Sequence, residues 1–218
     1  MMRFDLINEI VSINSFQTYL EIGVYQPEIC FDRINCEKKT GVDPGLEHLE
    51  NPVDYKVTSD QFFEMLARGE TEFPVDHKWD VVFIDGLHLA DQVYKDINNS
   101  LRHLSDNGFI VLHDCLPPNF FMAREDYDID GVRYPWNGTT WKAYYRTLVS
   151  NDSVEACLLN TDWGLGVIKK SKREVLPENT NQFYEFNRMI SNYVENMNVV
   201  SYPDLVKFIT NPKTKEEI

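Results

Sequence analysis

Short apolar runs alternate with segments of helical periodicity along most of the chain. The strongest runs, 79–84 and 108–112, are rich in β-branched and aromatic residues and end in polar clusters, as buried strands do. Weaker runs of the same kind lie at 18–22, 39–42, 55–57, 154–159 and 165–168. Strands that alternate with helices favour an α/β fold with a largely parallel sheet.

The helix between the two strongest runs has the clearest pattern. Apolar residues from Ala90 to Leu104 recur at three- and four-residue steps, which leaves Asp91 and Asp96 among the residues expected to face water. Asn107-Gly108 follows as the expected helix stop. Further helices are predicted near the N-terminus, after a cap at Ser59 or Asp60, and at 140–149, 181–194 and 202–209.

The segment 115–136 interrupts this alternation. It contains three prolines and an acidic stretch, and it shows no periodicity. Irregular segments of this length inside a compact domain are commonly functional loops or disordered segments. We expect this segment to border a binding site.

Charge excludes two classes of partner. The 218 residues carry 35 Asp+Glu against 21 Lys+Arg, a formal net charge of -14. A chain this acidic offers no basic stripe to neutralise phosphates, so nucleic acid and anionic membranes are not expected partners. With 43% hydrophobic residues, the chain can nevertheless build one substantial core.

The cysteines and the N-terminus favour a cytoplasmic protein. The four cysteines form no close C-x-x-C pair, so we expect reduced thiols. The N-terminal residues are broken up by acidic and polar side chains, unlike a signal peptide, and no run of eighteen apolar residues predicts a membrane span.

Two residues after the first strands point to a nucleoside. Gly23 follows the first predicted strand, and a helix expected beyond it would offer free N–H groups. Asp43 ends the second strand twenty positions later, where a carboxylate can accept hydrogen bonds from ribose hydroxyls. The plain alternative is a glycine turn and a surface aspartate.

Ionisable residues follow both strong strands. Asp85 and His88 come after 79–84, and His113 and Asp114 come after 108–112. If the strands are parallel neighbours, two carboxylates and two imidazoles converge at one edge of the sheet, as in an active site. The alternative is that the aspartates cap helices and a histidine belongs to the core.

These segments together resemble the class I S-adenosylmethionine-dependent methyltransferases. The resemblance rests on residues 20–24, 41–44, 59–60, 83–88 and 111–115, and on 136–142 and 161–168. Within the class it is greatest to a bacterial methyltransferase-domain subfamily associated with polysaccharide and glycan biosynthesis. It implies a Rossmann-like, seven-stranded sheet with helices on both faces over residues 1–170, with 171–218 as a C-terminal helical extension on the same domain.

The resemblance also implies roles for individual residues. Glu21, Gly23 and Tyr25 would border the methionine part of S-adenosylmethionine, and Asp43 would hold the ribose. Ser59 and Asp60 would flank the adenine, and Asp85 would lie beneath the sulfonium. Pro27 stands where many relatives have glycine, which removes one N–H donor.

A divalent cation, Mg²⁺ or Mn²⁺, is the second cofactor that the resemblance suggests. Asp85 and Asp114 fill two ligand positions of metal-dependent O-methyltransferases, and Cys115 stands at the third. A thiol is a poor ligand for Mg²⁺, whereas His113 could complete a site for a softer ion.

Catalysis by such an enzyme needs a base for the acceptor. His88 or His113 is the expected base, with Asp114 orienting it or binding metal. Trp136 and Trp141 would line an acceptor pocket, although Trp141 could equally be core. The expected reaction is O-methylation of a sugar, a glycan precursor or a small hydroxylated metabolite.

Three alternatives remain open. Asp85, His88, His113 and Asp114 could form a metal-dependent hydrolase centre, or the chain could be an inactive, cofactor-binding partner in a complex. The chain could also be a homodimer, because apolar residues in the tail suit either a dimer face or an internal contact: Phe183, Phe186, Met189, Ile190 and Tyr193.

Overall fold

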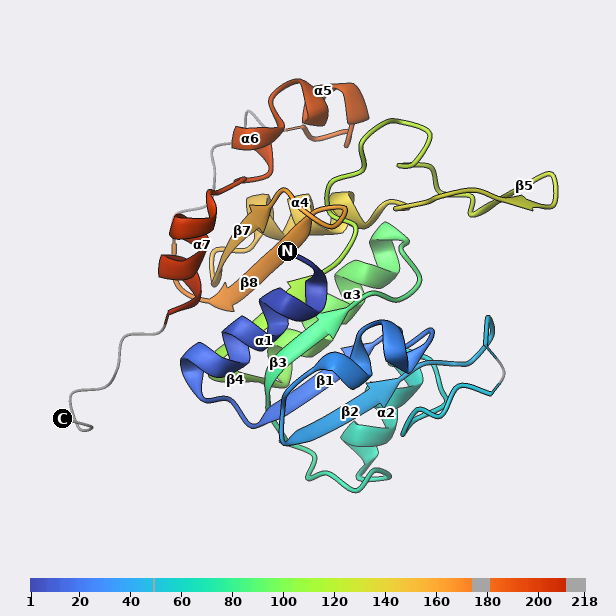
Figure 1. The fold of residues 1–218 in the computed structure, drawn as a ribbon, viewed down its shortest axis with the longest axis vertical. Coiled ribbons are helices and arrows are strands. Elements are labelled where there is room, and N and C mark those ends of the chain that lie inside the picture. Colours follow the sequence, from blue (N-terminus) through green and yellow to red (C-terminus); the bar gives the residue numbers. More distant parts are fainter. Residues whose placement is uncertain (49, 174–180, 211–218) are drawn as a thin grey trace.

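The computed structural model describes residues 1–48, 50–173 and 181–210. Its main feature is a six-stranded sheet in the order β2-β1-β3-β4-β8-β7 (Figure 1). The strands are β1 Thr18–Ile22, β2 Lys38–Val42, β3 Trp79–Ile84, β4 Leu104–Leu112, β7 Val154–Leu159 and β8 Leu165–Lys170. Only β8 runs against its neighbours, because it pairs antiparallel with both β4 and β7. The predicted α/β fold with a mostly parallel sheet is confirmed.

The predicted strand 55–57 is reduced to one bridge. Tyr55 pairs with Val42 in a parallel bridge at the edge of the sheet. The N–H of Gly41 donates to the side chain of Asp54 at 2.7 Å, so it is not available to extend the ladder. This contact blocks further pairing on one side of Tyr55, and the sheet has six strands in place of seven.

Helices cover both faces of the sheet. α1 Arg3–Asn14 and α7 Tyr202–Ile209 lie on one face, and α2 Ser59–Arg68, α3 Ala90–Arg102 and α4 Thr140–Ser150 lie on the other (Figure 1). Successive strand residues point to opposite faces, so Val82 joins the core under α2 and α3 while Val81 and Phe83 join the core under α1. Short helices, α5 Phe186–Ser191 and α6 Tyr193–Asn196, replace the single helix predicted over 181–194.

Two predicted helix boundaries are wrong. Thr58, one residue before the predicted caps, caps α2 in a capping box with Gln61. α3 ends at Arg102, and Asn107-Gly108 lie inside β4. Gly108 is needed there because a Cβ atom would lie 2.6 Å from the carbonyl oxygen of Asp80 on the neighbouring strand.

The segment after β1 also differs from the prediction. Pro27 begins a short 3₁₀ helix, η1 Pro27–Ile29, followed by η2 Phe31–Arg33, where a longer helix was expected. Proline suits the first turn of a helix, but Cys30 leaves the helical region at φ -136° and divides the segment in two. The described segment that directly follows β1 therefore has two 3₁₀ turns in place of an α-helix.

The irregular segment 115–136 carries a small hairpin. β5 Asp128–Ile129 pairs with β6 Val132–Arg133, and the hairpin projects away from the sheet (Figure 1). Trp141 is fully buried in the core, so the prediction that it lines an acceptor pocket is wrong.

The described tail packs on the body through four buried apolar side chains. Met189 and Met197 join the core under α2 and α3. Leu205 and Ile209, both on α7, join the core under α1. Of the apolar tail residues offered for a dimer face, Met189 is fully buried and Phe183 is 84% exposed. Parts of the predicted extension 171–218, namely 174–180 and 211–218, lie outside the described residues.

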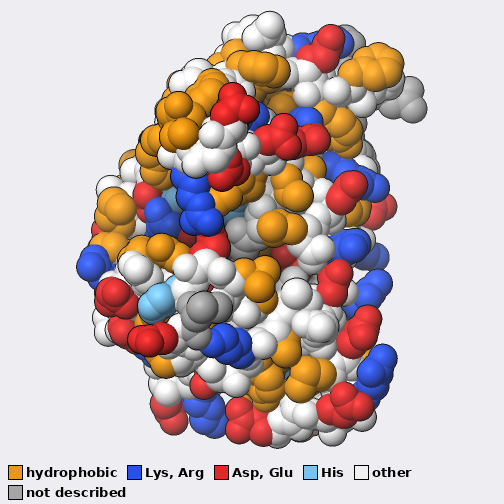
Figure 2. All heavy atoms as spheres, turned by 90° about the vertical axis from the view of Figure 1, so that its right-hand side faces the viewer, with side chains coloured by type: hydrophobic (Ala, Val, Ile, Leu, Met, Phe, Trp, Pro, Cys, Tyr) orange, Lys and Arg blue, Asp and Glu red, His pale blue; other side chains and the backbone are white. Residues whose placement is uncertain are grey.

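The described part of the chain has no helix long and apolar enough to cross a bilayer. All four cysteines are free thiols. On the face in Figure 2, acidic and basic side chains are mixed, and no continuous basic stripe crosses the residues drawn there in colour.

Candidate active site

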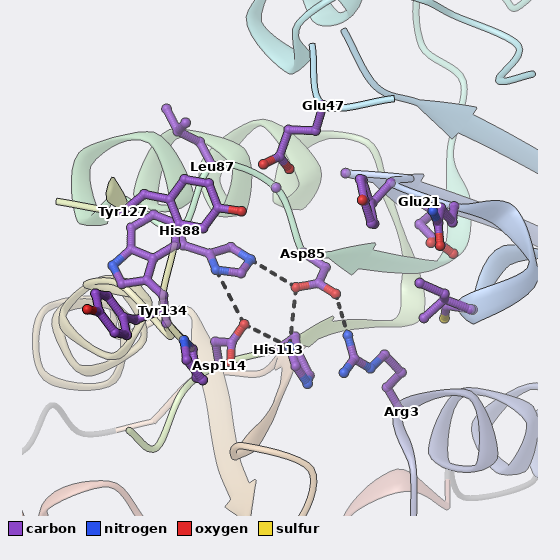
Figure 3. Close-up of a pocket in the computed structure, with 18 residues that line it drawn as sticks. Arg3, Glu21, Glu47, Asp85, Leu87, His88, His113, Asp114, Tyr127 and Tyr134 are labelled. Carbon is purple, nitrogen blue, oxygen red and sulfur yellow. Dashed lines mark hydrogen bonds and ion pairs between the residues drawn. The ribbon is translucent and has the colours of Figure 1, made fainter. Parts of the chain in front are cut away.

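Two adjoining cavities lie at the carboxyl ends of β1, β2, β3 and β4. One has a volume of about 490 Å³ and is lined by Arg3, Glu21, His88, His113 and Asp114 among others (Figure 3). The other has a volume of about 320 Å³ and is lined by Asp43, Ser59 and Asp60 among others. Gly23, Tyr25, Asp85 and Leu87 border both cavities. The residues predicted to bind the cofactor, and also His88, His113 and Asp114, therefore line one cavity or the other, whereas Trp141 and Cys115 line neither.

Gly23 brings the two cavities together. Its φ of +93° is in the left-handed region, and a Cβ atom would lie 2.3 Å from the carbonyl oxygen of Asp85. Only glycine allows the end of β1 to approach the end of β3 this closely. The glycine at this position thus has a packing cause, in addition to the predicted place beside the cofactor.

The smaller cavity contains polar groups at both ends. Asp43 Oδ1 accepts a hydrogen bond from the N–H of Gly45 at 2.6 Å, and burial raises the pKa of the Asp43 carboxyl. At the other end, Gln92 Nε2 lies 3.2 Å from Ser59 Oγ and 3.1 Å from one oxygen each of Asp60 and Asp96.

Asp96 was expected to face water, and that prediction is wrong. The residue is 1% exposed, and burial raises the pKa of its carboxyl to about 6. The pattern of α3 missed it because Asp96 lies beside Ile97 at the margin of the apolar face.

The larger cavity contains the predicted cluster of carboxylates and imidazoles. β3 and β4 are parallel, with Ile84 opposite Leu112, so the residues that follow them meet at one edge. His113 Nδ1 lies 2.9 Å from Asp114 Oδ2 and 3.3 Å from Asp85 Oδ1. His88 Nε2 lies 3.1 Å from the same Asp85 oxygen (Figure 3). The predicted convergence is confirmed.

The two imidazoles differ in their surroundings. Burial lowers the pKa of His113, but the charge of Asp85 and the contacts with Asp114 and Asp162 outweigh it and hold the pKa well above its ordinary value. The surroundings of His113 therefore favour its protonated form. His88 also has a raised pKa, because the hydrogen bond to Asp85 and the charge of Asp114 outweigh burial. Its side chain is 18% exposed, against 4% for His113.

His88 is held in a strained backbone conformation. Its φ is +57°, and that of Asp114 is +58°, both in the left-handed region that such residues seldom adopt. The ring of His88 stacks on Trp136, with centroids 5.3 Å apart. His88 Nδ1 makes no hydrogen bond and lies 3.4 Å from Asp114 Oδ2.

Neither aspartate caps a helix. Leu89 stands at the N-cap of α3 and makes no side-chain capping bond. Asp114 Oδ1 instead accepts a hydrogen bond from Asn137 at 2.5 Å. The structure thus removes the alternative in which Asp85 and Asp114 are only helix caps.

Sequence reasoning missed two charged residues of the cluster. Arg3 begins α1, and its Nη1 lies 2.6 Å from Asp85 Oδ2. Asp162, from the turn between β7 and β8, contacts both Arg3 and His113. Contacts across 82 and 159 positions leave no signal in a local pattern.

Glu21 lies in the wall of the larger cavity, 2% exposed. Burial raises the pKa of its carboxyl to about 8, although the hydroxyl of Tyr19, 2.5 Å from Glu21 Oε2, lowers it. Near neutral pH, Glu21 is thus a mostly neutral acid beside a charged cluster.

The residues present fit a divalent cation. Asp85, His113 and Asp114 each offer one ligand atom, and these atoms lie within 4.8 Å of one another. Cys115 does not take part, because its fully buried Sγ lies near the carbonyl oxygens of Leu112 and His113. Two carboxylates and an imidazole suit Mn²⁺ or Zn²⁺ better than Mg²⁺.

Known proteins share this fold. Residues 20–115 match the family model described as "Methyltransferase domain". An O-methyltransferase from Bacillus cereus, in complex with SAH, is similar with a TM-score of 0.51 and 14% identity, over 77% of this chain and 80% of that chain. No curated protein matches the chain in sequence.

Two further solved structures give the same result. TomG, an O-methyltransferase of tomaymycin synthesis from Streptomyces achromogenes in complex with SAM, has a TM-score of 0.52 and 14% identity, over 78% of this chain and 79% of that chain. Cofactor-bound Rv0187 from MTB has a TM-score of 0.53 and 14% identity, over 79% and 82%. Residues 20–115 therefore resemble a methyltransferase domain, and the chain has the Rossmann-like fold of these solved structures.

Proposed function

We propose that this protein is an S-adenosylmethionine-dependent O-methyltransferase that acts on a small hydroxylated molecule. The observation that carries the proposal is the pair of cavities that meet at Gly23 and Asp85. One contains residues suited to a nucleoside, and the other contains a cluster of carboxylates and imidazoles. We further propose that residues 1–170 form the catalytic domain and 171–218 an extension of it.

The cofactor occupies both cavities in this proposal. Asp43 accepts hydrogen bonds from the ribose hydroxyls, and Ser59 and Asp60 border the adenine. Glu21 and Tyr25 border the methionine portion. S-adenosylmethionine, when bound, supplies a methyl group on a positively charged sulfur, and Asp85 is the carboxylate at the junction of the cavities.

His88 is the base in this proposal. Its Nε2 donates to Asp85, and its Nδ1 makes no hydrogen bond, so Nδ1 can take the proton of the acceptor hydroxyl. Asp114 Oδ2, 3.4 Å from Nδ1, then stabilises the imidazolium. His113 is less suited to this step because its side chain is only 4% exposed, against 18% for His88.

A divalent cation would be held by Asp85, His113 and Asp114. There it would lower the pKa of a bound acceptor hydroxyl. The proton would still pass to a neighbouring base, and His88 is the more exposed imidazole of the cluster.

The acceptor side of the larger cavity has aromatic walls. Tyr127, Tyr134 and Trp136 line it, and Tyr127 lies 5.0 Å from Trp136 between ring centroids. Aromatic faces suit sugars and planar rings. The acceptor we propose is a sugar, a glycan precursor or a small phenolic or hydroxylated metabolite.

The hydrolase alternative is not favoured. The methyltransferase-domain match covers both strands that carry the cluster and the segment that carries Asp43. A hydrolase gives no role to the smaller cavity. A measurement of methyl transfer distinguishes an active enzyme from an inactive, cofactor-binding partner.

The test is methyl transfer to a set of acceptors. The full chain is incubated with methyl-labelled S-adenosylmethionine and hydroxylated sugars or phenols, and the products are identified by mass spectrometry. We expect one acceptor class to gain a methyl group. His88→Ala should lower the rate by about 10²-fold or more while S-adenosylhomocysteine still binds.

His77→Ala, at the opposite end of β3, is the matched control and should keep its rate. Equal rates in His88→Ala and the wild type would remove His88 as the base. Cofactor binding with no transfer to any acceptor would favour the inactive partner.

A further inference from the structure

Arg3 is fixed in the candidate active site by a two-sided clamp. Its backbone N–H and its Nε donate to Asp162 Oδ2 at 2.8 and 3.1 Å, and Nη2 donates to Asp162 Oδ1 at 3.3 Å. The side chain of Asp162 is only 3% exposed. The guanidinium therefore has one orientation, and in that orientation Nη1 points at Asp85 (Figure 3).

Every carboxylate oxygen of the candidate metal ligands already has a protein donor. Asp85 Oδ2 faces Arg3 at 2.6 Å, and Asp85 Oδ1 faces both imidazoles. Asp114 Oδ2 faces His113, and Asp114 Oδ1 accepts from Asn137. A cation that enters this cluster must displace donors rather than fill an open position.

Arg3 is the donor with a permanent charge. An imidazole can release a proton and become a ligand, but a guanidinium stays charged at every physiological pH. It also stays in place, because Asp162 holds it from the other side. A divalent cation on Asp85 would share that carboxylate with a positive charge a few ångströms away.

We propose that Arg3 is a built-in cation that competes with a divalent metal ion for Asp85 and thereby sets the metal affinity of the site. Through Arg3, helix α1 becomes part of the active site. The competition concerns the metal site of the proposed function, but it does not depend on which group the enzyme transfers.

The test is calorimetric titration of the full chain with Mn²⁺. We expect Arg3→Met to bind Mn²⁺ about tenfold or more tightly than the wild type. Arg68→Met removes the same charge from an exposed pair on α2 and should leave the affinity within about twofold. Asp85→Asn added to Arg3→Met should abolish the gain, which assigns it to this site.

Arg3→Lys serves if Arg3→Met does not fold. Lysine keeps the charge but cannot span Asp162 and Asp85 together, so we expect a smaller gain in the same direction. Equal or weaker Mn²⁺ binding in the folded Arg3 variants, or a gain that survives Asp85→Asn, would overturn the proposal. Absence of Mn²⁺ binding in every variant would do the same.

Binding of S-adenosylhomocysteine is measured in the same samples. It should persist in the Arg3 variants. If the wild type does not bind S-adenosylhomocysteine, the proposed function is contradicted. If the Arg3 variants bind S-adenosylhomocysteine but their Mn²⁺ affinity is unchanged, only the competition between Arg3 and the metal ion is contradicted.

Discussion

His88 and His113 share carboxylate partners but are suited to different tasks. His113 has carboxylates near both ring nitrogens and is nearly excluded from solvent, and these carboxylates favour its protonated form in the metal-free chain. His88 is more exposed, at 18% against 4%, and each imidazole has one ring nitrogen without a hydrogen bond, Nδ1 in His88 and Nε2 in His113. The sequence offered both as bases, and only their burial and partners separate them.

Glu21 should make stability depend on pH. Its pKa is about 8 in the folded chain and near 4.5 in the unfolded chain, so the folded state binds the extra proton between these values. The stabilisation is complete below pH 4.5 and is lost as pH rises through 8. In urea unfolding, the free energy of unfolding should fall by about 2 kcal/mol from pH 6 to pH 8 as Glu21 loses its proton.

Glu21→Gln should lack this part of the pH dependence, because the amide keeps a hydrogen bond to Tyr19 without titrating. Glu28→Gln, at an exposed position on η1, is the control. If the free energy of unfolding of Glu21→Gln changes with pH as in the wild type from pH 6 to 8, Glu21 is not a neutral acid in the folded chain.

At the scale of elements, periodicity and strand composition identified most of the fold. The strands β1, β3, β7 and β8 and the helices α1, α3, α4 and α7 follow patterns that are local in sequence. The missing seventh strand depends on the Asp54 side chain, which takes a backbone donor that strand pairing would need. The prediction of a helix stop at Gly108 is wrong. Glycine is required there by close contact with Asp80, which lies on a neighbouring strand and is far away in sequence.

The cap of α2 provides a test at this scale. Thr58 accepts a hydrogen bond from the N–H of Gln61, and the Gln61 side chain accepts from the N–H of Thr58. Thr58→Ala should lower the free energy of unfolding by about 1 kcal/mol in a urea titration. Ser12→Ala, exposed on α1, should change it by less than about 0.5 kcal/mol. Equal effects of the two changes would contradict the assigned cap.

At the scale of the molecule, the net charge is -14, but acidic and basic groups are paired within the candidate active site. Asp85, Asp114 and Asp162 meet the guanidinium of Arg3 and two imidazoles with raised pKa values. Asp85 and Asp114 could be predicted from sequence because parallel strand ends meet at one edge. Arg3 and Asp162 could not, because only the packing of α1 against the β7–β8 turn brings them there.

Calorimetric titration with S-adenosylhomocysteine tests the central claim most directly. We expect one binding site per chain in the wild type and in Asp76→Ala, which alters an exposed carboxylate away from both cavities. Asp43→Ala should weaken binding by about tenfold or more, because the ribose hydroxyls lose a charged acceptor. Absence of binding in the wild type, or equal affinity in Asp43→Ala, would contradict it.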